Sequence, residues 1–499
     1  MIGFCAKFVE TERREGLFRR ELGGVRYWHL IRYWLFNDLV LPHYMSGGIL
    51  HPDDLAGRPV PRTFAGRVAR RVSSALCRLR DMTACSPDAV IVPRKVLFAM
   101  TPRMAAMGGV RKGFVMLDFV TPLLKSSYAL WEHPRLCGYT PQPLSRKVFH
   151  LPRAERRRAE VLAPSGRFAA AAPRRQAEAA ALADLFGRAY GFPFEVGRIW
   201  WMIDEVLRFR EIYAPLFERW FRRLGVRVLV TSVPEVRENA VMTEVAHGLG
   251  LPVAEMQHGT VYPEHMVYDL GERGSVYSPD YFLSWGDHWS EQLVNYPNIR
   301  AVSVGYPFLD HFVRICPRRP RRNGGPLRVL FVSQGMIGAE MSRMALELAR
   351  RIPPDRCRVV YKLHPNETNT WRTLYPDLAN SPVEVVGNCD RNIYQCLQDT
   401  DVTVGTNSTA LIEGFAWGAV ALVLRFLPAG ETMDGFCRAG LAEFVDSDEE
   451  LYSKVRCMAD GNARTDIPEF DMSRFWVPDA AQNVASFIDS LASGDCPPE

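Results

Sequence analysis

The sequence predicts an α/β fold with two doubly wound, Rossmann-like domains that face a cleft. The chain has 499 residues, more than one hydrophobic core usually organises, so two domains are expected. Short apolar runs of strand length alternate with helical stretches in both halves, which indicates parallel sheets covered by helices. Between residues 311 and 326 the chain becomes rich in proline, glycine and arginine with nothing to bury, as in an interdomain linker.

The linker and the pattern of predicted strands and helices divide the chain into three parts. We expect an N-terminal Rossmann-like domain with helical insertions over residues 1–315 and a C-terminal Rossmann-like domain over residues 326–480. Residues 481–499 are expected to form a helix and tail. The helix near residues 480–491 could cross back to brace the two domains.

The first half carries the helical insertions. Residues 17–44 are aromatic and apolar with interspersed arginines, and their spacing predicts one amphipathic helix packed on a domain. A membrane-surface role for the same segment stays open, because aromatic and arginine neighbours also suit an interface. Residues 151–175 are rich in arginine and alanine, and we expect an exposed helical excursion or mobile loop with a solvated face there, with a patch that binds anionic lipid or the acceptor as the alternative.

Apolar runs bounded by turn residues predict the strands. In the first half these are residues 90–92, 96–100, 114–118, 128–131, 226–230, 252–257, 281–285 and 301–304, with helices at 194–224 and 237–248. In the second half they are residues 327–332, 358–363, 383–386, 401–404 and 419–424, with a helix at 338–351.

Composition and charge narrow the class of protein. With 47% hydrophobic and 23% charged residues, the chain is too apolar for disorder and has an ordinary globular composition. The net charge is +5, from 61 basic and 56 acidic residues. Such a modest excess favours anionic partners such as nucleotides, and it does not indicate a nucleic-acid binder.

The cysteines and the apolar runs bear on the compartment. The 11 cysteines are scattered singly, without a CxxC pair or a Cys/His cluster at zinc-ligand spacing, which is typical of a reduced, cytosolic protein. Charge appears too early at the N-terminus for a secretory signal, and no uninterrupted apolar run reaches the roughly 18 residues of a transmembrane helix. We expect a cytoplasmic protein, with peripheral contact at the inner face of the cytoplasmic membrane left open.

Three loops of the second half follow predicted strands, where ligands bind in an open parallel sheet. The first contains His364, and the proline after it restricts the histidine to an extended backbone. Its imidazole could donate to a phosphate or protonate a departing one, although a histidine packed at a strand terminus would look the same. Lys362 in the same run joins it as a candidate binding residue.

The second loop follows the strand at 401–404 and opens a helix. The helix N-terminus and the hydroxyls of Ser408 and Thr409 suit a phosphate. Glu413, one turn further on, could accept hydrogen bonds from ribose hydroxyls. Simple helix capping by Asn407 or Ser408 is the alternative interpretation, and it is compatible with phosphate binding because both use the same geometry.

Two more loops complete the set of candidates. Gln334 and Gly335 form a weaker version of the same pattern after the strand at 327–332. In the first half, His258 ends a strand, and Gly259 after it lets the backbone turn sharply. That placement suits a general base taking a proton from a hydroxyl, with a core histidine as the alternative.

The order of these motifs resembles a known superfamily. Gln-His-Gly at 257–259, Gly-Tyr-Pro-Phe-Leu-Asp at 305–310, Lys-Leu-His-Pro at 362–365 and Asn-Ser-Thr-Ala-Leu-Ile-Glu at 407–413 are similar to motifs of bacterial capsule and surface-polysaccharide transferases of the GT-B type. These are the Kdo transferases of capsule export, the polysialyltransferases and the CDP-glycerol glycerophosphotransferases of teichoic acid synthesis. The similarity covers roughly residues 226–424.

The resemblance implies roles for the candidates. His364, Ser408, Thr409 and Glu413 would hold a cytidine-nucleotide donor in the second domain, and His258 would act near the acceptor in the first. We add Gln334, Gly335 and Lys362 to the donor-binding set.

Two departures from the family's motifs stand out. The glycerophosphotransferases usually have Tyr-Ser-Ser where this chain has Thr-Asn-Ser-Thr at 406–409. The acidic first-domain motif of the sialyltransferases has no clear counterpart, which leaves Asp118 and Glu132 as alternative carboxylate bases.

The expected activity is therefore glycosyl transfer, inverting and metal-independent. The resemblance implies that a sugar such as Kdo or sialic acid would pass from a nucleotide-activated, CMP-linked donor to a glycan or lipid-linked glycan of the bacterial cell envelope, as in capsule polysaccharide biosynthesis. The nucleotide sugar is a substrate, so no cofactor is expected. Polyol-phosphate transfer from CDP-glycerol or CDP-ribitol is the nearest alternative, followed by a nucleotide-sugar epimerase and a non-catalytic assembly scaffold.

Other nucleotide chemistries lack their motifs. Asp399-Thr-Asp401 resembles a metal-binding DxD motif, but it leads into a predicted buried strand instead of following one. The chain has no Walker A lysine loop and no GxGxxG after a strand, which argues against an ATPase or a dehydrogenase.

Overall fold

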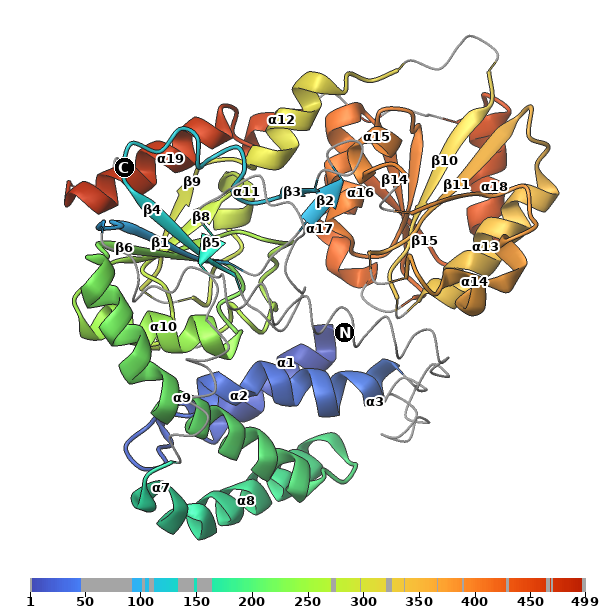
Figure 1. The fold of residues 1–499 in the computed structure, drawn as a ribbon. Coiled ribbons are helices and arrows are strands. Elements are labelled where there is room, and N and C mark those ends of the chain that lie inside the picture. The colour runs from blue at the N-terminus through green and yellow to red at the C-terminus, as the bar shows by residue number, and fades with distance from the viewer. Residues whose placement is uncertain are drawn as a thin grey trace, which may run out of the picture.

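The computed structural model describes residues 2–45, 92–100, 104–106, 112–132, 148–149, 164–270, 275–296, 298–319, 325–335, 337–365, 367–387, 390–427, 430–463, 467 and 470–495. Two parallel sheets, each with its own helices, lie beside one another (Figure 1). A two-stranded antiparallel ribbon, β2 (Met104–Ala106) and β3 (Lys112–Phe114), lies outside both sheets.

The first sheet has seven parallel strands in the order β5-β4-β1-β6-β7-β8-β9. Their bounds are β1 Val96–Met100, β4 Tyr128–Glu132, β5 Val148–Phe149, β6 Val228–Thr231, β7 Val253–Met256, β8 Tyr281–Ser284 and β9 Arg300–Ser303. The strand order reverses between β1 and β6, which makes this the topological switch point of the sheet.

The second sheet repeats the pattern with six parallel strands in the order β12-β11-β10-β13-β14-β15. Their bounds are β10 Leu327–Val332, β11 Cys357–Lys362, β12 Glu384–Val386, β13 Val402–Gly405, β14 Val420–Leu424 and β15 Ala442–Val445. Its switch point lies between β10 and β13. The two sheets confirm the predicted α/β fold class with two doubly wound, Rossmann-like domains.

Helices cover both faces of each sheet, which is why the strands read as nearly continuous apolar runs. In β1, Val96, Phe98 and Met100 pack in a cluster with α19 (Ala480–Ser493), whereas Leu97 and Ala99 pack in a cluster with α9 and α10. The helices that accompany the first sheet are α7 Gly166–Ala170, α8 Ala172–Tyr190, α9 Val196–Leu224, α10 Arg237–Gly248, α11 Asp287–Ser290 and α12 Pro307–Ile315.

The second sheet follows the same rule. Phe331 of β10 faces a cluster that includes α13 and α18, and Leu330 faces the opposite cluster with α15 and α16. The helices here are α13 Gly338–Arg351, α14 Trp371–Leu374, α15 Ile393–Leu397, α16 Thr409–Glu413, α17 Asp434–Arg438 and α18 Asp448–Ala459, with 3-10 turns η4 Pro376–Leu378, η5 Gly414–Trp417, η6 Gly430–Met433 and η7 Met472–Arg474.

The last helix, α19 (Ala480–Ser493), packs against the first sheet (Figure 1). On the way, the N–H of Val477 donates to the carbonyl of Trp285 at 2.9 Å. Gly305 has a φ of +90°, and a Cβ there would lie 2.2 Å from the carbonyl oxygen of Val477. The glycine of the Gly-Tyr-Pro motif is therefore required by the close approach of the returning chain.

Aromatic packing joins the two domains around the linker. Phe312 of α12 stacks on Tyr394 of α15 with ring centroids 4.9 Å apart, and Tyr394 stacks on Trp417 of η5 at 5.5 Å. The indole N–H of Trp417 donates to the carbonyl of Cys316 at 2.6 Å. These contacts hold the end of α12 against the second domain.

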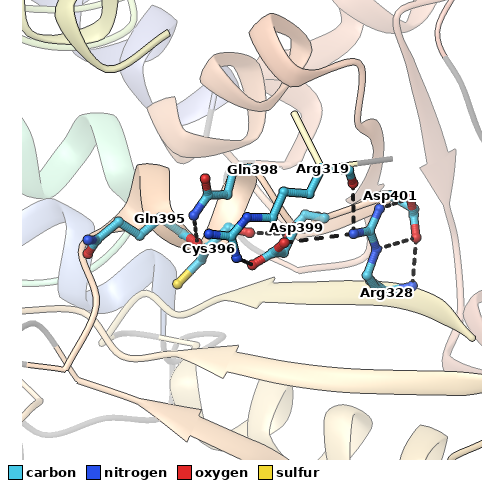
Figure 2. A network of polar contacts seen from close by, with 8 residues as sticks. Arg319, Arg328, Gln395, Cys396, Gln398, Asp399 and Asp401 are labelled. Carbon is cyan, nitrogen blue, oxygen red and sulfur yellow. Dashed lines mark hydrogen bonds and ion pairs between the residues drawn. The ribbon is translucent and has the colours of Figure 1, made fainter. Parts of the chain in front are cut away.

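The Asp-Thr-Asp sequence at 399–401 bonds to Arg319 and Arg328, which lie on either side of the linker (Figure 2). The guanidinium of Arg328 donates to both carboxylate oxygens of Asp401, at 3.0 and 2.8 Å, and the backbone N–H of Arg328 donates to Asp401 at 2.9 Å. Asp399 pairs with Arg319 at 3.3 Å. The Asp401 carboxylate is thus committed to Arg328 and ties the start of β10 to the start of β13.

Three expectations about the first half were wrong. The single helix over residues 17–44 is instead η1 (Leu17–Arg19), then α2 (Trp28–Leu35), a π-helical turn (Phe36–Val40) and α3 (Leu41–Met45), preceded by α1 (Ile2–Arg14). Gly23 and Gly24 both take positive φ and interrupt the helical run. The strand at 114–118 is also wrong, because β3 ends at Phe114 and the following apolar residues are buried in turns. Of the strand at 90–92, residues 90 and 91 lie outside the described residues.

The arginine-rich segment is the third correction. Residues 151–163 lie outside the described residues, and residues 166–175 enter α7 and α8. Arg175 is buried, pairs with Asp204 at 2.9 Å and stacks over the ring of Phe168. The expectation of a solvated face is wrong for Arg175, because the docking of α8 on α9 brings a carboxylate to it.

Candidate functional site

The switch point of the second sheet is lined by side chains that bond across it. After β10, the side chain of Gln334 donates to the amide oxygen of Asn407 at 2.9 Å and accepts from the hydroxyl of Thr406 at 2.5 Å. Thr406 and Asn407 follow β13, the neighbouring strand. Hydrogen bonds therefore join the two loops at the switch point, with Gln334 half-buried and Gly335 exposed beside it.

Ser408 and Thr409 lie in the second of these loops and are half-buried. Ser408 is the N-cap of α16, and its hydroxyl accepts the N–H of Ala410 at 3.4 Å. The helix is a short one of five residues that continues directly into η5. The capping interpretation is confirmed for Ser408, whereas its predicted role in ligand binding stays a prediction.

His364 follows β11, the other neighbour of β10, and is half-buried. Its backbone N–H donates to the carboxylate of Glu367 at 2.8 Å. The other Glu367 oxygen accepts from the phenol of Tyr375 at 2.5 Å. Glu367 is buried, so one carboxylate fixes the turn that presents the histidine at the carboxyl edge of the sheet.

Lys362 and Glu413 lie deeper than the sequence suggests. Lys362, the last residue of β11, is 4% exposed, and Glu413, the last residue of α16, is 5% exposed. The carboxylate of Glu413 lies beside the phenol of Tyr394, and Tyr306 of the first domain lies there too. Burial first, and then these two neighbours, raise the pKa of Tyr394 well above its usual value. Glu413 is therefore placed where the two domains meet.

In the first domain, the loop after β7 carries His258. The side chain of Gln257 donates to the carbonyl of Gly259 at 2.8 Å and accepts the backbone N–H of Trp285 at 2.8 Å. It thereby ties this loop to the end of β8. Gln257 and Trp285 also line a small pocket together with Tyr306, the residue that interacts with Tyr394 of the second domain.

A buried acidic group stands behind His258. Nδ1 of His258 lies 3.9 Å from Oε1 of Glu255, and Glu255 is completely buried in β7. The phenol of Tyr268 donates to the same oxygen at 2.8 Å. Burial raises the pKa of the Glu255 carboxyl well above its usual range, the hydrogen bond from Tyr268 opposes this, and the like charge of Glu235 adds to it.

The loop after β6, at the switch point of the first sheet, holds a strained residue. Val233 has a φ of +59°, a left-handed conformation that a β-branched side chain rarely adopts. The buried amide of Asn239 supports it by donating to the carbonyls of Ser232, at 2.5 Å, and Val233, at 3.2 Å. Such strain persists where surrounding contacts impose it, and it gathers at functional sites.

The two alternative carboxylate bases lie outside the loop after β7. Asp118 lies in the turns after β3, and Glu132 ends β4. In the sheet, β1 and β6 separate β4 from β7, the strand that precedes His258. Glu255, Gln257 and Glu367 were not among the predicted site residues. An acidic residue inside an otherwise apolar strand was the available signal for Glu255, because an unpaired charge is seldom buried.

The described part of the chain has neither a cluster of metal ligands nor a membrane-spanning helix. There, no three histidine, cysteine, aspartate or glutamate side chains gather closely enough to hold a metal ion. None of the helices in that part is both long and apolar enough to cross a bilayer.

Comparison with known proteins gives distant structural similarities. No protein-family model matches the chain, and no curated protein does either. The UDP-GlcNAc 2-epimerase of Methanocaldococcus jannaschii is 10% identical, with 79% of this chain and 99% of that chain covered and a TM-score of 0.44. MurG of Acinetobacter baumannii is 13% identical, with 80% and 100% covered and a TM-score of 0.41. The spinosyn rhamnosyltransferase SpnG is 14% identical, with 80% and 95% covered and a TM-score of 0.42. Because these TM-scores lie below 0.5, the fold assignment rests on the two sheets themselves.

Proposed function

We propose that this protein is a nucleotide-sugar-dependent glycosyltransferase of the GT-B type. The observation that carries the proposal is that side chains following strands of the first sheet lie close to side chains following strands of the second. Tyr394 of the second domain lies beside both Glu413, which follows the switch-point strand, and Tyr306 of the first domain. Tyr306 in turn shares a pocket with Gln257, the neighbour of His258. A ligand held by one domain would thus lie close to groups of the other.

The second domain is the proposed donor side. Gln334 and Gly335 on one loop and Ser408 and Thr409 on the other lie at the switch point, which is where open parallel sheets bind nucleotides. His364, presented by Glu367, would contact the phosphate. Lys362 would add positive charge from the end of β11, and Glu413 would accept from the ribose. Together these groups would stabilise the charge that develops on the leaving phosphate.

The first domain is the proposed acceptor side, with His258 as general base. The histidine would take the proton of an acceptor hydroxyl while that oxygen attacks the anomeric carbon, and the electron pair of the breaking bond would leave with the phosphate. This is a direct inverting displacement, and we propose that it proceeds without a metal. By the motif resemblance, the donor is a CMP-linked acidic sugar, and the acceptor is a bacterial surface glycan reached from the cytoplasmic side.

A thermal-shift screen with CMP, CDP, UDP, GDP and ADP tests the donor side. A ligand that binds only the folded protein raises its melting temperature by mass action. We expect a selective response to CMP or CDP that is weakened by His364→Ala and Ser408→Ala. Ser447→Ala is the matched control, because Ser447 caps α18 in the same domain away from the switch point. Unchanged nucleotide affinity in both site variants would contradict the assignment.

Turnover assays separate the related activities. A transferase consumes donor only when acceptor is present, whereas an epimerase converts donor alone. Transfer of a polyol phosphate would release CMP from CDP-glycerol or CDP-ribitol. We expect His258→Ala to abolish transfer and to leave nucleotide binding intact. No response to any nucleotide would instead support a non-catalytic scaffold.

A further inference from the structure

Glu255 is the penultimate residue of β7, an internal strand of the first sheet, and none of its surface is exposed. The other members of this strand, Val253, Ala254 and Met256, are apolar. Burying a carboxyl group in a sheet is unfavourable unless polar partners compensate for the lost water. A carboxyl group at this position is therefore expected to have polar partners inside the protein.

Two groups meet at one oxygen of this carboxyl. The phenol of Tyr268 donates to Oε1 at 2.8 Å, and Nδ1 of His258 lies 3.9 Å from the same atom. Tyr268 is itself held by ring contacts with His265 and Tyr296. Tyr268 thereby fixes the orientation of the Glu255 carboxyl.

The histidine ring is oriented with one edge inward. Its Nδ1 atom is buried, while 15% of the side chain remains exposed. The exposed part of the ring therefore lies on atoms other than Nδ1. Gln257 fixes the backbone on both sides of His258 through its bonds to Gly259 and Trp285.

We propose that Glu255 is the positioning residue of His258 and holds the proton of its imidazole on Nδ1, so that Nε2 is the atom that accepts the acceptor's proton. This inference rests on the proposed function, in which His258 is the base. A neutral imidazole carries one proton, and a proton on Nε2 would make the exposed edge a donor instead of a base. A carboxylate facing Nδ1 selects the useful tautomer, by the logic of a carboxylate–histidine pair.

The proton and charge balance follow directly. The acceptor's O–H bond breaks, its proton moves to Nε2, and its oxygen forms the new glycosidic bond while the sugar–phosphate bond breaks. The resulting imidazolium lies next to the Glu255 carboxylate, which offsets its charge in a buried setting. The 3.9 Å separation is longer than a hydrogen bond, and we expect it to shorten in the acceptor complex.

The Glu255–His258 pair should also determine how transfer activity falls at low pH. The titratable groups that act on the Glu255 carboxyl are His258, Tyr268, Glu235 and, through its own coupling to Glu255, Tyr296. Burial and Glu235 raise the pKa of Glu255, so the carboxylate form is lost at a higher pH than for an ordinary glutamate. Transfer should therefore decline as the pH falls, beginning above the usual glutamate range.

Glu255→Gln in the full chain is the test, since the amide keeps the shape and removes the charge. We expect kcat to fall by about 10³-fold, the donor affinity and KM to change by less than about 3-fold, and the acidic limb to move. Nitrogen-15 spectra of the histidine rings should show the Nδ1–H tautomer of His258 in the native protein and its loss in the variant. Glu244→Gln is the control, because Glu244 pairs with Arg210 on the outer helices of the same domain.

Tyr268→Phe is the second variant, in case Glu255→Gln does not fold. It releases the carboxyl from its anchor, and we expect kcat to fall about 10-fold with a displaced acidic limb. Unchanged kcat, pH profile and tautomer in either variant would overturn the role of Glu255. Full transfer by His258→Ala would instead overturn the assignment of the base, and with it the proposed mechanism.

Discussion

The carboxylate of Glu367 accepts the backbone N–H of His364 at 2.8 Å, three residues before it in the chain. The second oxygen of the same carboxylate accepts the phenol of Tyr375 at 2.5 Å. One buried acid thus joins a loop at the carboxyl edge of the second sheet to the segment that follows α14. These two hydrogen bonds fix the conformation of the loop, and their contribution to stability can be measured separately from nucleotide binding.

Removing this carboxylate should destabilise the second domain. Glu367→Ala leaves the His364 N–H and the Tyr375 hydroxyl without their acceptor, which should lower the free energy of unfolding by about 2–3 kcal/mol in urea titrations. Glu347→Ala on the exposed side of α13 is the control, and a change within about 0.5 kcal/mol is expected there. Equal losses in the two variants would show that the Glu367 bonds contribute little.

A methyl group at Gly338 should disturb the same cluster. A Cβ at this position would lie 1.9 Å from the hydroxyl of Tyr375 and 2.8 Å from Oε1 of Glu367. We expect Gly338→Ala to lower the free energy of unfolding by about 1–3 kcal/mol, because the cluster has to shift. Gly435→Ala in α17 meets nothing within 4 Å and should be neutral or slightly stabilising. Thermal unfolding of both variants checks the contrast.

Asp401 should be a structural residue and not a ligand for a catalytic metal. Asp401→Ala leaves the guanidinium and backbone N–H of Arg328 without their shared acceptor, and we expect a loss of about 3 kcal/mol. Asp399→Ala removes a partly exposed pair with Arg319 and should cost about 0–1 kcal/mol. If metal addition restored activity to either variant, this assignment would be contradicted.

Buried histidines should make the protein less stable in mild acid. Burial lowers the pKa of His29 to about 3 and that of His265 to about 4, whereas an unfolded histidine titrates near pH 6.5. As the pH falls from about 6.5 to 4, these two histidines become protonated in the unfolded chain, whereas in the folded protein they stay largely neutral. Stability therefore falls by up to about 1.4 kcal/mol per pH unit for each histidine.

Denaturation at pH 7 and pH 5 measures this slope. We expect His29→Phe to lessen the acid sensitivity, with the ring contact to Tyr277 retained. His247 acts with the opposite sign, because the hydrogen bond with Asp280 raises its pKa. Its stabilising contribution is complete below about pH 6.5 and disappears as the pH rises through the folded-state value, so His247→Gln should lose stability at low pH. A wild-type slope unaffected by His29→Phe would contradict the prediction.

Relief of the strain at Val233 should separate stability from activity. Val233→Gly removes a side chain from a left-handed backbone, and we expect the free energy of unfolding to rise by about 1 kcal/mol. Val236→Gly, in an ordinary extended conformation three residues on, should be destabilising by about the same amount. If the strain serves the acceptor site, Val233→Gly should be more stable and less active. Lower stability in this variant would show that no strain is stored there.

Much of the fold could be predicted from the sequence alone, and so could the positions of several candidate residues directly after strands. The bounds of α10, α13 and β10 agree with the predicted ranges, because local periodicity and glycine or proline punctuation specify such elements. His258, Gln334, His364 and Ser408 all follow strands in the structure, as predicted. A residue's position after a buried strand is a local property, so it can be read before the order of the strands is known.

Only the tertiary structure decided which of these groups meet. The pairing of His258 with Glu255, the contacts of Tyr394 with Glu413 and Tyr306, and the burial of Arg175 depend on helix docking and domain packing. The return of α19 to the first sheet and the cross-link of Gln334 to Asn407 also join segments far apart in the chain. Local periodicity carries no information about such partners, because they are set by strand order and by the packing of faces that are complete only in the folded molecule.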